Sequence, residues 1–256
     1  MKNKKIIEEL PGKTIYESNT IGEVCHYFTD THHCPVKKST LDVPGKGAFN
    51  HNISSFLFTK LNQLSIPTQF IRSLNMRETL MVEGSPLPFD VHVRCLSGKK
   101  MALDFGISEQ EVFTPPLIEY TPTNKAINYS LNEDFLMSLD WATQEELDEV
   151  KDLALYTTRV LQGVLISFDL NLVEISLSMS YSPNGSIVIS GQLFPEFFCA
   201  FDLKNHEYLG LSRDQATLDS ESFDLEGHKK IAQRLGLYTP STFCSLTLSP
   251  TALHIV

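Results

Sequence analysis

Apolar side chains recur at helical spacing after Gly47. They stand at Phe49, Ile53, Phe56, Leu57, Leu61 and Leu64. Residues three and four positions apart share one face of a helix, so this stretch predicts an amphipathic helix that buries that face. We expect the helix to end before Pro67, because the residue that precedes a proline is pushed out of helical geometry.

A longer apolar stripe follows Thr143. Thr143 and Glu146 have the spacing of a capping box, in which two side chains satisfy free backbone amides at the start of a helix. The stripe continues at helical spacing through Leu147, Val150, Leu153, Val160, Leu161, Val164, Leu165 and Phe168. We therefore expect a long helix here, and a shorter last helix over residues 227–237.

Shorter apolar segments between turn-forming residues predict strands. They cover residues 13–17, 24–28, 69–72, 79–83 and 89–95, and residues 172–179 and 186–193 flank a Pro-Asn-Gly turn that indicates a hairpin. This order predicts an α+β fold with antiparallel sheets. The turn formers of residues 84–88 are expected to separate an N-terminal β-rich lobe, residues 1–84, from a C-terminal α+β lobe with a helical tail, residues 85–256.

Composition narrows the class of protein. The chain has 256 residues, with 31 acidic against 21 basic side chains and a net charge of −10. Nucleic acid and anionic membrane surfaces need basic surface, so neither is an expected partner. No apolar run reaches the ~20 residues of a membrane span, and no secretion signal is visible. With five widely spaced cysteines, these features predict a cytoplasmic protein with reduced thiols.

Cysteine and histidine residues gather early in the chain without forming a known zinc motif. They are Cys25, His26, His32, His33 and Cys34. Zinc favours such ligands, but the spacing matches no standard site, and strand alternation would point Cys25 and His26 to opposite faces. We interpret these residues as structural.

Several short segments, taken in order, resemble one enzyme family. They are Gly-Lys at 12–13, Gly-Lys-Gly-Ala-Phe-Asn at 45–50, Ile-Pro-Thr at 66–68, Val-His-Val-Arg at 91–94, Thr-Pro-Pro-Leu at 114–117, Leu-Asn-Glu at 131–133 and Leu-Val-Glu-Ile at 172–175, followed by Pro195 and Asp202. No piece is specific alone, but their order and spacing resemble SAICAR synthetase, the phosphoribosylaminoimidazole-succinocarboxamide synthase of purine biosynthesis. The resemblance spans roughly residues 8 to 215.

The resemblance implies a two-lobed fold with ATP held in a cleft between the lobes. In that family ATP phosphorylates the carboxylate of a carboxyaminoimidazole ribotide, and the amine of aspartate then attacks the acyl phosphate. This is ATP-dependent C–N ligation, and magnesium would neutralise phosphate charge through hard oxygen ligands. The implied partners are a nucleotide or another small phosphorylated metabolite, and a homo-oligomer is a further expectation.

Matching positions and side-chain charge give the candidates for holding a nucleotide or phosphate. They are Lys13, Lys46, Asn50, Arg94, Lys99, Lys100 and Glu133. Lys46 would lie at a helix start, where backbone amides favour anions. The alternatives stay open: Lys13 as a solvated strand end, Arg94 paired with a carboxylate, and Glu133 as a first-turn carboxylate that balances the helix dipole.

The predicted hairpin departs from the family pattern at its catalytic positions. Ser176 and Ser178 replace a lysine and a glutamate, and Gly191 and Gln192 replace an aspartate–glutamate pair. Neutral side chains can coordinate a cation but do not offset its charge. The carboxylates left as candidate metal ligands are Glu174, Glu196 and Asp202. The aromatic residues expected to fill the former polar pocket as core are Phe194, Phe197, Phe198 and Phe201.

Three hypotheses about function follow. The first is a divergent ligase, which requires carboxylates to converge on a rearranged magnesium site. The second is a catalytically inactive pseudoenzyme that binds a nucleotide or a partner without turnover. The third is a repurposed enzyme that acts on another phosphorylated metabolite through Lys46, Arg94, Lys99 and Lys100. The replacements argue against the usual turnover, and no catalytic residue is assigned.

Overall fold

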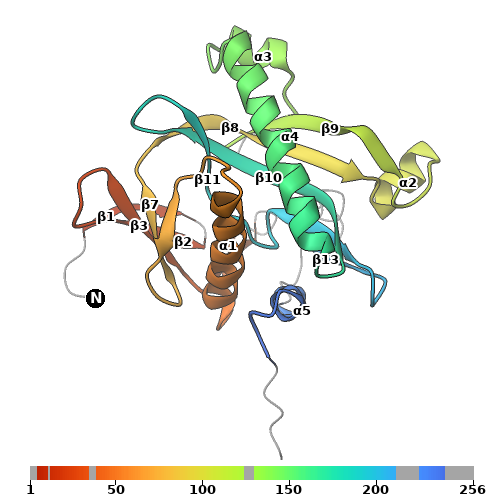
Figure 1. The fold of residues 1–256 in the computed structure, drawn as a ribbon, viewed down its shortest axis with the longest axis horizontal. Coiled ribbons are helices and arrows are strands. Elements are labelled where there is room, and N and C mark those ends of the chain that lie inside the picture. The colour runs from red at the N-terminus through yellow and green to blue at the C-terminus, as the bar shows by residue number, and fades with distance from the viewer. Residues whose placement is uncertain (1–4, 11, 35–38, 124–129, 212–224, 240–256) are drawn as a thin grey trace, which may run out of the picture.

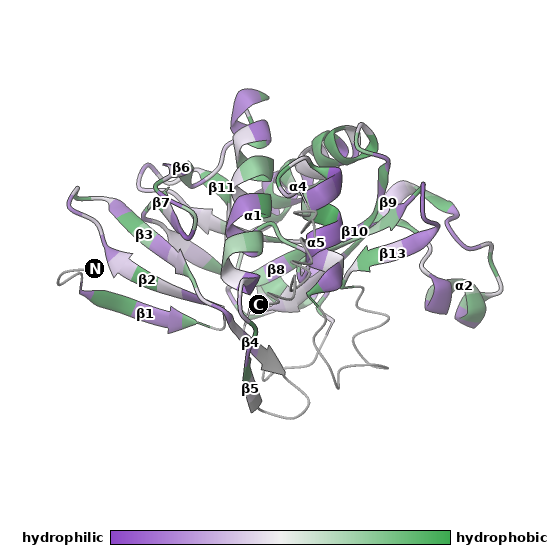
Figure 2. Ribbon diagram, turned by 90° about the horizontal axis from the view of Figure 1, so that it is seen from below, coloured by the Kyte–Doolittle hydropathy of each residue, from purple (hydrophilic) through white to green (hydrophobic). Residues whose placement is uncertain are grey.

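Two antiparallel sheets form most of the fold (Figure 1). The computed structural model describes residues 5–10, 12–34, 39–123, 130–211 and 225–239. The first sheet has five strands in the order β1 (Ile6–Leu10), β2 (Lys13–Glu17), β3 (Glu23–Phe28), β7 (Glu78–Val82) and β6 (Phe70–Ser73). A separate two-stranded hairpin joins β4 (Thr31–Cys34) to β5 (Ser39–Asp42), and it projects from the body in Figure 2.

The second sheet comes from the later part of the chain. Its order is β13 (Glu207–Gly210), β12 (Phe198–Asp202), β10 (Leu170–Tyr181), β8 (Ser85–Leu96) and β9 (Val112–Pro122), with β11 (Ile187–Ser190) paired to β10. Helices beside antiparallel sheets confirm the predicted α+β fold. The chain passes from one sheet to the other between β7 and β8, and the division into lobes at residues 84 and 85 stays a prediction.

Helices pack against these sheets. They are α1 (Lys46–Gln63), α2 (Lys99–Phe105), α3 (Glu133–Ser138), α4 (Gln144–Ile166) and α5 (Glu226–Arg234). Helix α1 stands between the two sheets, and α4 lies across the second sheet (Figure 1). None of the helices in the described ranges is long and apolar enough to cross a membrane.

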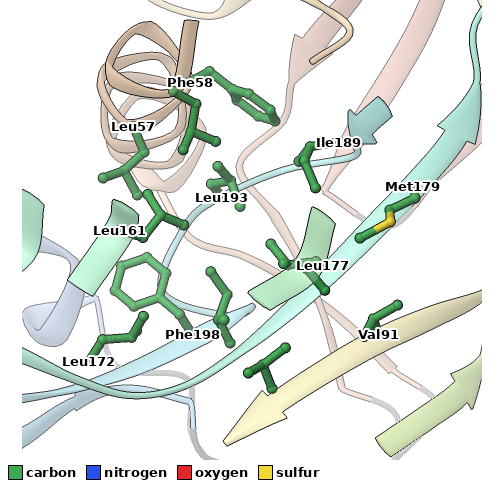
Figure 3. Close-up of a cluster of buried hydrophobic side chains, with 14 of the residues drawn as sticks. Leu57, Phe58, Val91, Leu161, Leu172, Leu177, Met179, Ile189, Leu193 and Phe198 are labelled. Carbon is green, nitrogen blue, oxygen red and sulfur yellow. The ribbon is translucent and has the colours of Figure 1, made fainter. Parts of the chain in front are cut away.

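The predicted apolar stripes meet in one core (Figure 3). Leu57 from α1, Leu161 from α4 and Leu177 from β10 converge there, each no more than 1% exposed. Ile189 and Leu193 approach from the segment that follows the hairpin turn. Burial of one such side chain stabilises the fold by roughly 1.5–3 kcal/mol. The same core therefore fixes α1 and the hairpin relative to each other.

Most predicted elements are confirmed, with one correction. The capping box of Thr143 and Glu146 is present in full at the start of α4. Residues 84–88, which were expected from their turn formers to separate the lobes, include the first residues of a strand, because β8 begins at Ser85. Pro86 lies opposite Ser180 in the ladder, and the carbonyl of Pro88 accepts from the amide of Thr123. Prolines can occupy this strand end because their carbonyls still bond.

A tight contact holds the start of α1. Asp30 accepts a hydrogen bond from the Gly47 amide at 2.9 Å and a two-pronged pair from Arg77 at 2.7 and 2.9 Å. A Cβ on Gly47 would lie 2.5 Å from the Phe28 carbonyl and 2.8 Å from that of Thr29. Only glycine fits here, and this packing fixes the position of the neighbouring Lys46.

Gly47→Ala should therefore destabilise the protein, by about 1–3 kcal/mol, as overpacking usually does. Gly163→Ala is the matched control, because nothing lies within 4 Å of a Cβ there and α4 should gain about 1 kcal/mol. Urea unfolding of both variants measures the difference. Equal shifts in the same direction would contradict the close packing at Gly47.

Candidate functional site

A cavity of about 270 Å³ lies between the two sheets. Strands β1, β2 and β3 and the segment joining β7 to β8 form one side, and β10 with the end of β11 forms the other. Its apolar wall is made by Ile7, Leu10, Ile15, Val24, Val82, Leu87 and Met179. Pockets of this kind, mostly apolar with a few polar groups, are the usual small-molecule sites.

Lys13 is the one lysine or arginine among the residues that line this cavity. It is the first residue of β2 and half-buried. Burial lowers its pKa to about 8, against the opposing charges of Glu8 and Asp90. Burial, followed by the charge of Lys13, also lowers the pKa of His26 well below its usual range. The cavity thus holds one titrating amine beside a neutral imidazole.

Small side chains form the opposite wall. The Ser178 hydroxyl donates to Asp90 at 2.7 Å, and both Ser178 and Gly191 line the cavity. Gly191 has a φ of +73°, and a Cβ there would lie 2.9 Å from the Cβ of Ser178. These are two positions at which the family resemblance expected metal carboxylates.

A second charged cluster lies next to Gly12, the residue that precedes Lys13. A Cβ at Gly12 would lie 3.5 Å from the Nζ of Lys46, which bonds both carboxylate oxygens of Glu196 at 3.0 and 3.1 Å. His32 contacts the same carboxylate at 3.2 Å. Burial acts to raise the pKa of Glu196, but the His32 hydrogen bond and the charges of Lys46 and His228 outweigh it, so the pKa is lowered.

Asn50 lies one turn after Lys46 on α1 and is 1% exposed. Its Oδ1 has no hydrogen-bond partner among the described residues. A buried acceptor without a partner costs free energy unless a water or ligand meets it. Asn50 is therefore available to a ligand that enters beside Lys46.

Arg94 and Glu174 form a buried pair away from the cavity. Their side chains are 8% and 1% exposed, and Arg94 Nη1 lies 2.8 Å from Glu174 Oε2. His92 Nε2 is 3.4 Å from the same oxygen. Burial, helped by the charge of Glu174, raises the pKa of Cys95 to about 12. This group of residues has the features of a structural network in the sheet.

Asp202 is fully buried and bound by Arg234 of α5, with contacts of 2.9 to 3.0 Å. It also accepts hydrogen bonds from the amides of Lys204 and Asn205, in the turn after β12. Its arrangement joins α5 to the sheet. The three candidate metal ligands, Glu174, Glu196 and Asp202, thus each pair with a different cation.

Magnesium does not fit this donor set. Within the described ranges, no group of three or more His, Cys, Asp or Glu side chains is placed to hold a metal ion. The side chains of His33 and Cys34 lie outside the described part of the chain. The carboxylates that remain are compensated by arginine and lysine, so a cation would have to displace those partners.

The remaining candidates lie elsewhere. Lys99 and Lys100 begin α2, at the opposite end of the molecule from β1 and β2, and Lys100 pairs with Asp104 (Figure 1). Glu133 stands in the first turn of α3, where it accepts from Tyr120 at 3.2 Å and faces Lys151 at 3.6 Å. The structure therefore brings Lys46 against Glu196, with Asn50 one turn further along α1. Lys13 lines the separate cavity, and the other candidates lie elsewhere.

Sequence reasoning missed several residues of the site. His32 had been interpreted with other histidines and cysteines, and nothing near it in the sequence points to Glu196. Asp90 and β1 residues such as Ile7 carry no motif at all. β1 has the sequence Ile-Ile-Glu-Glu-Leu, without the alternation that predicts a strand, so the sequence did not indicate this element.

Comparison with known proteins gives a consistent result. A family model described as SAICAR synthetase matches residues 11–227. The phosphoribosylaminoimidazole-succinocarboxamide synthase of Novosphingobium aromaticivorans is 30% identical over 243 residues, covering 93% of this chain and 91% of that protein. The protein of the same name from Rhizobium meliloti is 29% identical over 241 residues, covering 93% and 94%.

Solved structures agree. A phosphoribosylaminoimidazole-succinocarboxamide synthase from Ehrlichia chaffeensis is 26% identical, with a TM-score of 0.80, and the match covers 92% of this chain and all of that one. A SAICAR synthetase in complex with ADP also gives a TM-score of 0.80, at 20% identity, and covers 92% of this chain and 99% of that one. This second likeness shows the fold alone.

The lowered pKa of Lys13 predicts unusual reactivity. Only the neutral amine attacks an acylating reagent, so acetylation of Lys13 should rise with a midpoint near pH 8. The same lysine in the urea-unfolded chain should show its ordinary midpoint, near 10.5. Peptide mass spectrometry measures both profiles. Identical midpoints in the folded and unfolded chain would contradict the buried position of Lys13.

Removal of one partner from the Arg94–Glu174 pair should be costly. Arg94→Met leaves a carboxylate buried without its cation, which typically costs about 3–5 kcal/mol. The double variant Arg94→Met/Glu174→Gln removes that charge and should lose less than the single variant. Chemical unfolding measures the free energy of unfolding of both variants. An Arg94→Met variant as stable as the wild type would contradict the importance of this ion pair and would show that another group compensates Glu174.

Proposed function

The chain belongs to the SAICAR synthetase family, and from that premise we propose that it binds a purine nucleotide between its two sheets without performing the family's magnesium-dependent ligation. The observation that carries this proposal is the composition of the cavity. It combines an apolar wall with Lys13, but has Ser178 and Gly191 at the positions of the expected metal ligands.

Nucleotide binding is supported by the cavity and by a relative. The solved relative in complex with ADP has the same fold, and ATP is the phosphoryl donor that the family implies. The apolar residues of β1, β2 and β3 suit the faces of a purine base. Lys13 is the charged group that would hold a phosphate. Gly12, the residue before it, lies next to the side chain of Lys46.

The absence of ligation is supported by the cationic partners of the candidate metal carboxylates. A transferred phosphoryl group needs cationic stabilisation, which a carboxylate-bound magnesium ion commonly supplies. Here Glu174 pairs with Arg94, Glu196 with Lys46, and Asp202 with Arg234. The position of the family's lysine holds Ser176. Loss of each ~1.4 kcal/mol of transition-state stabilisation slows a reaction tenfold, so joint losses would abolish useful turnover.

One observation favours the alternative, an active ligase of the aspartate–ribotide type or of a related reaction. Lys46, Glu196 and His32 form a charged cluster beside Gly12, and Asn50 next to it has an acceptor without a partner among the described residues. Such a cluster can bind an anionic substrate and move a proton. It would have to do so without the carboxylates that hold magnesium.

Calorimetric titration with AMP and then with ADP tests the proposal. We expect binding that persists in EDTA and weakens by about 10–100-fold in Lys13→Met, since a hydrogen bond to a charged group contributes roughly 1.5–3 kcal/mol. Lys151→Met, on the exposed face of α4, is the matched control and should bind as the wild type does. An absence of binding by both nucleotides would refute the nucleotide site.

The same protein, supplied with ATP, magnesium, carboxyaminoimidazole ribotide and aspartate, should release no ADP above the rate without enzyme. Release that depends on both ribotide and aspartate would establish the alternative, whatever the titration shows.

A further inference from the structure

The charges that line the cavity oppose a polyphosphate. Glu8 and Glu83 contribute two exposed carboxylates at its edge, against the single ammonium of Lys13. His26 lies in the same wall and is neutral, since burial and Lys13 lower its pKa. Asp90 adds a further negative charge that acts on Lys13. A second or third phosphate would therefore meet carboxylates rather than cations.

The wall opposite Lys13 offers no place for the cation that normally accompanies a triphosphate. The Ser178 hydroxyl is already donated to Asp90, so a carboxylate and a hydroxyl there bind each other. A Cβ at Gly191 would lie 2.9 Å from the Cβ of Ser178, closer than side chains normally approach. The two small residues thus close this wall together.

The volume of the cavity, like the charges that line it, favours a ligand without a chain of phosphates. At about 270 Å³ it falls just below the roughly 300–1,000 Å³ typical of small-molecule pockets. A base and a sugar use such a volume, and a chain of phosphates would extend past Lys13 toward Glu196 and its partners. The negative charge of Glu196 is already neutralised by Lys46, which leaves Lys46 little excess attraction for another anion.

We infer that the cavity takes a purine nucleoside with at most one phosphate, bound without a divalent cation. This inference rests on the proposed nucleotide site and names its ligand class. The base lies against the apolar wall of β1, β2 and β3, and the single phosphate, where present, pairs with Lys13. Electrostatic fit, and not contact area, separates this ligand from ATP.

Titration of the full chain with adenosine, AMP and ATP, each in EDTA and in excess magnesium, tests the inference. AMP should bind at least tenfold more tightly than ATP, and magnesium should change neither the adenosine nor the AMP affinity. Magnesium-ATP binding more tightly than AMP would overturn the inference and leave the nucleotide site standing. Silence from all three ligands, and from ADP, would overturn both.

A variant that removes negative charge from the edge of the cavity tests the inference without a substitution at Lys13. A folding defect caused by changing Lys13 therefore does not enter the result. Glu8→Gln/Glu83→Gln should tighten ATP binding by about fivefold or more, because one charge pair at contact distance is worth about 1 kcal/mol in water. The gain in affinity should be larger for ATP than for adenosine, which carries no phosphate. Glu145→Gln/Glu149→Gln, on the exposed side of α4, removes the same charge at residues that do not line the cavity and should alter neither affinity. Equal effects of the two double variants would show that only net charge matters and would overturn the inference.

Discussion

The ion pair between Lys46 and Glu196 is the constraint on which the rest of the site depends. The two residues are 150 positions apart, and they join the start of α1 to the segment between β11 and β12. The lysine side chain is 2% exposed, so it needs a negative partner at close range. Because Gly47 and Asp30 fix the start of α1, the pair also fixes where the segment with Glu196 lies.

That constraint explains the surroundings of the cluster. Phe194, two residues before Glu196, is 2% exposed and packs edge-to-face against Phe28 and Phe197. The Nζ of Lys46 stands 5.8 Å from the centre of the Phe194 ring. The expected core positions of Phe194, Phe198 and Phe201 are confirmed by their burial, whereas Phe197 is only partly buried. That these residues replace a polar pocket stays a prediction. The same rings screen the ion pair from water, which strengthens it and makes Glu196 less available to a metal ion.

Local signals in the sequence were enough for most of the fold. The capping box of Thr143 and the apolar stripe of α1 depend on residues within a few positions of each other, and both elements form as expected. The pairing of Lys46 with Glu196 could not be predicted in this way. The chain has 21 basic and 31 acidic residues, and which of them meet depends on the packing of the two sheets. Family resemblance named both residues but assigned them to different ligands.

Ser178 and Gly191, at the two positions where the family resemblance predicts carboxylates, fit closely against each other. A side chain at residue 191 would need Ser178 to move, and the φ of +73° there already disfavours any residue other than glycine. A longer side chain at residue 178 would in turn fill the space that Gly191 leaves, and would break the hydrogen bond to Asp90. A carboxylate at residue 191 would therefore need a change of backbone just after β11. Ser178 and Gly191 therefore form one structural unit in this wall of the cavity, because a change at either position disturbs the other.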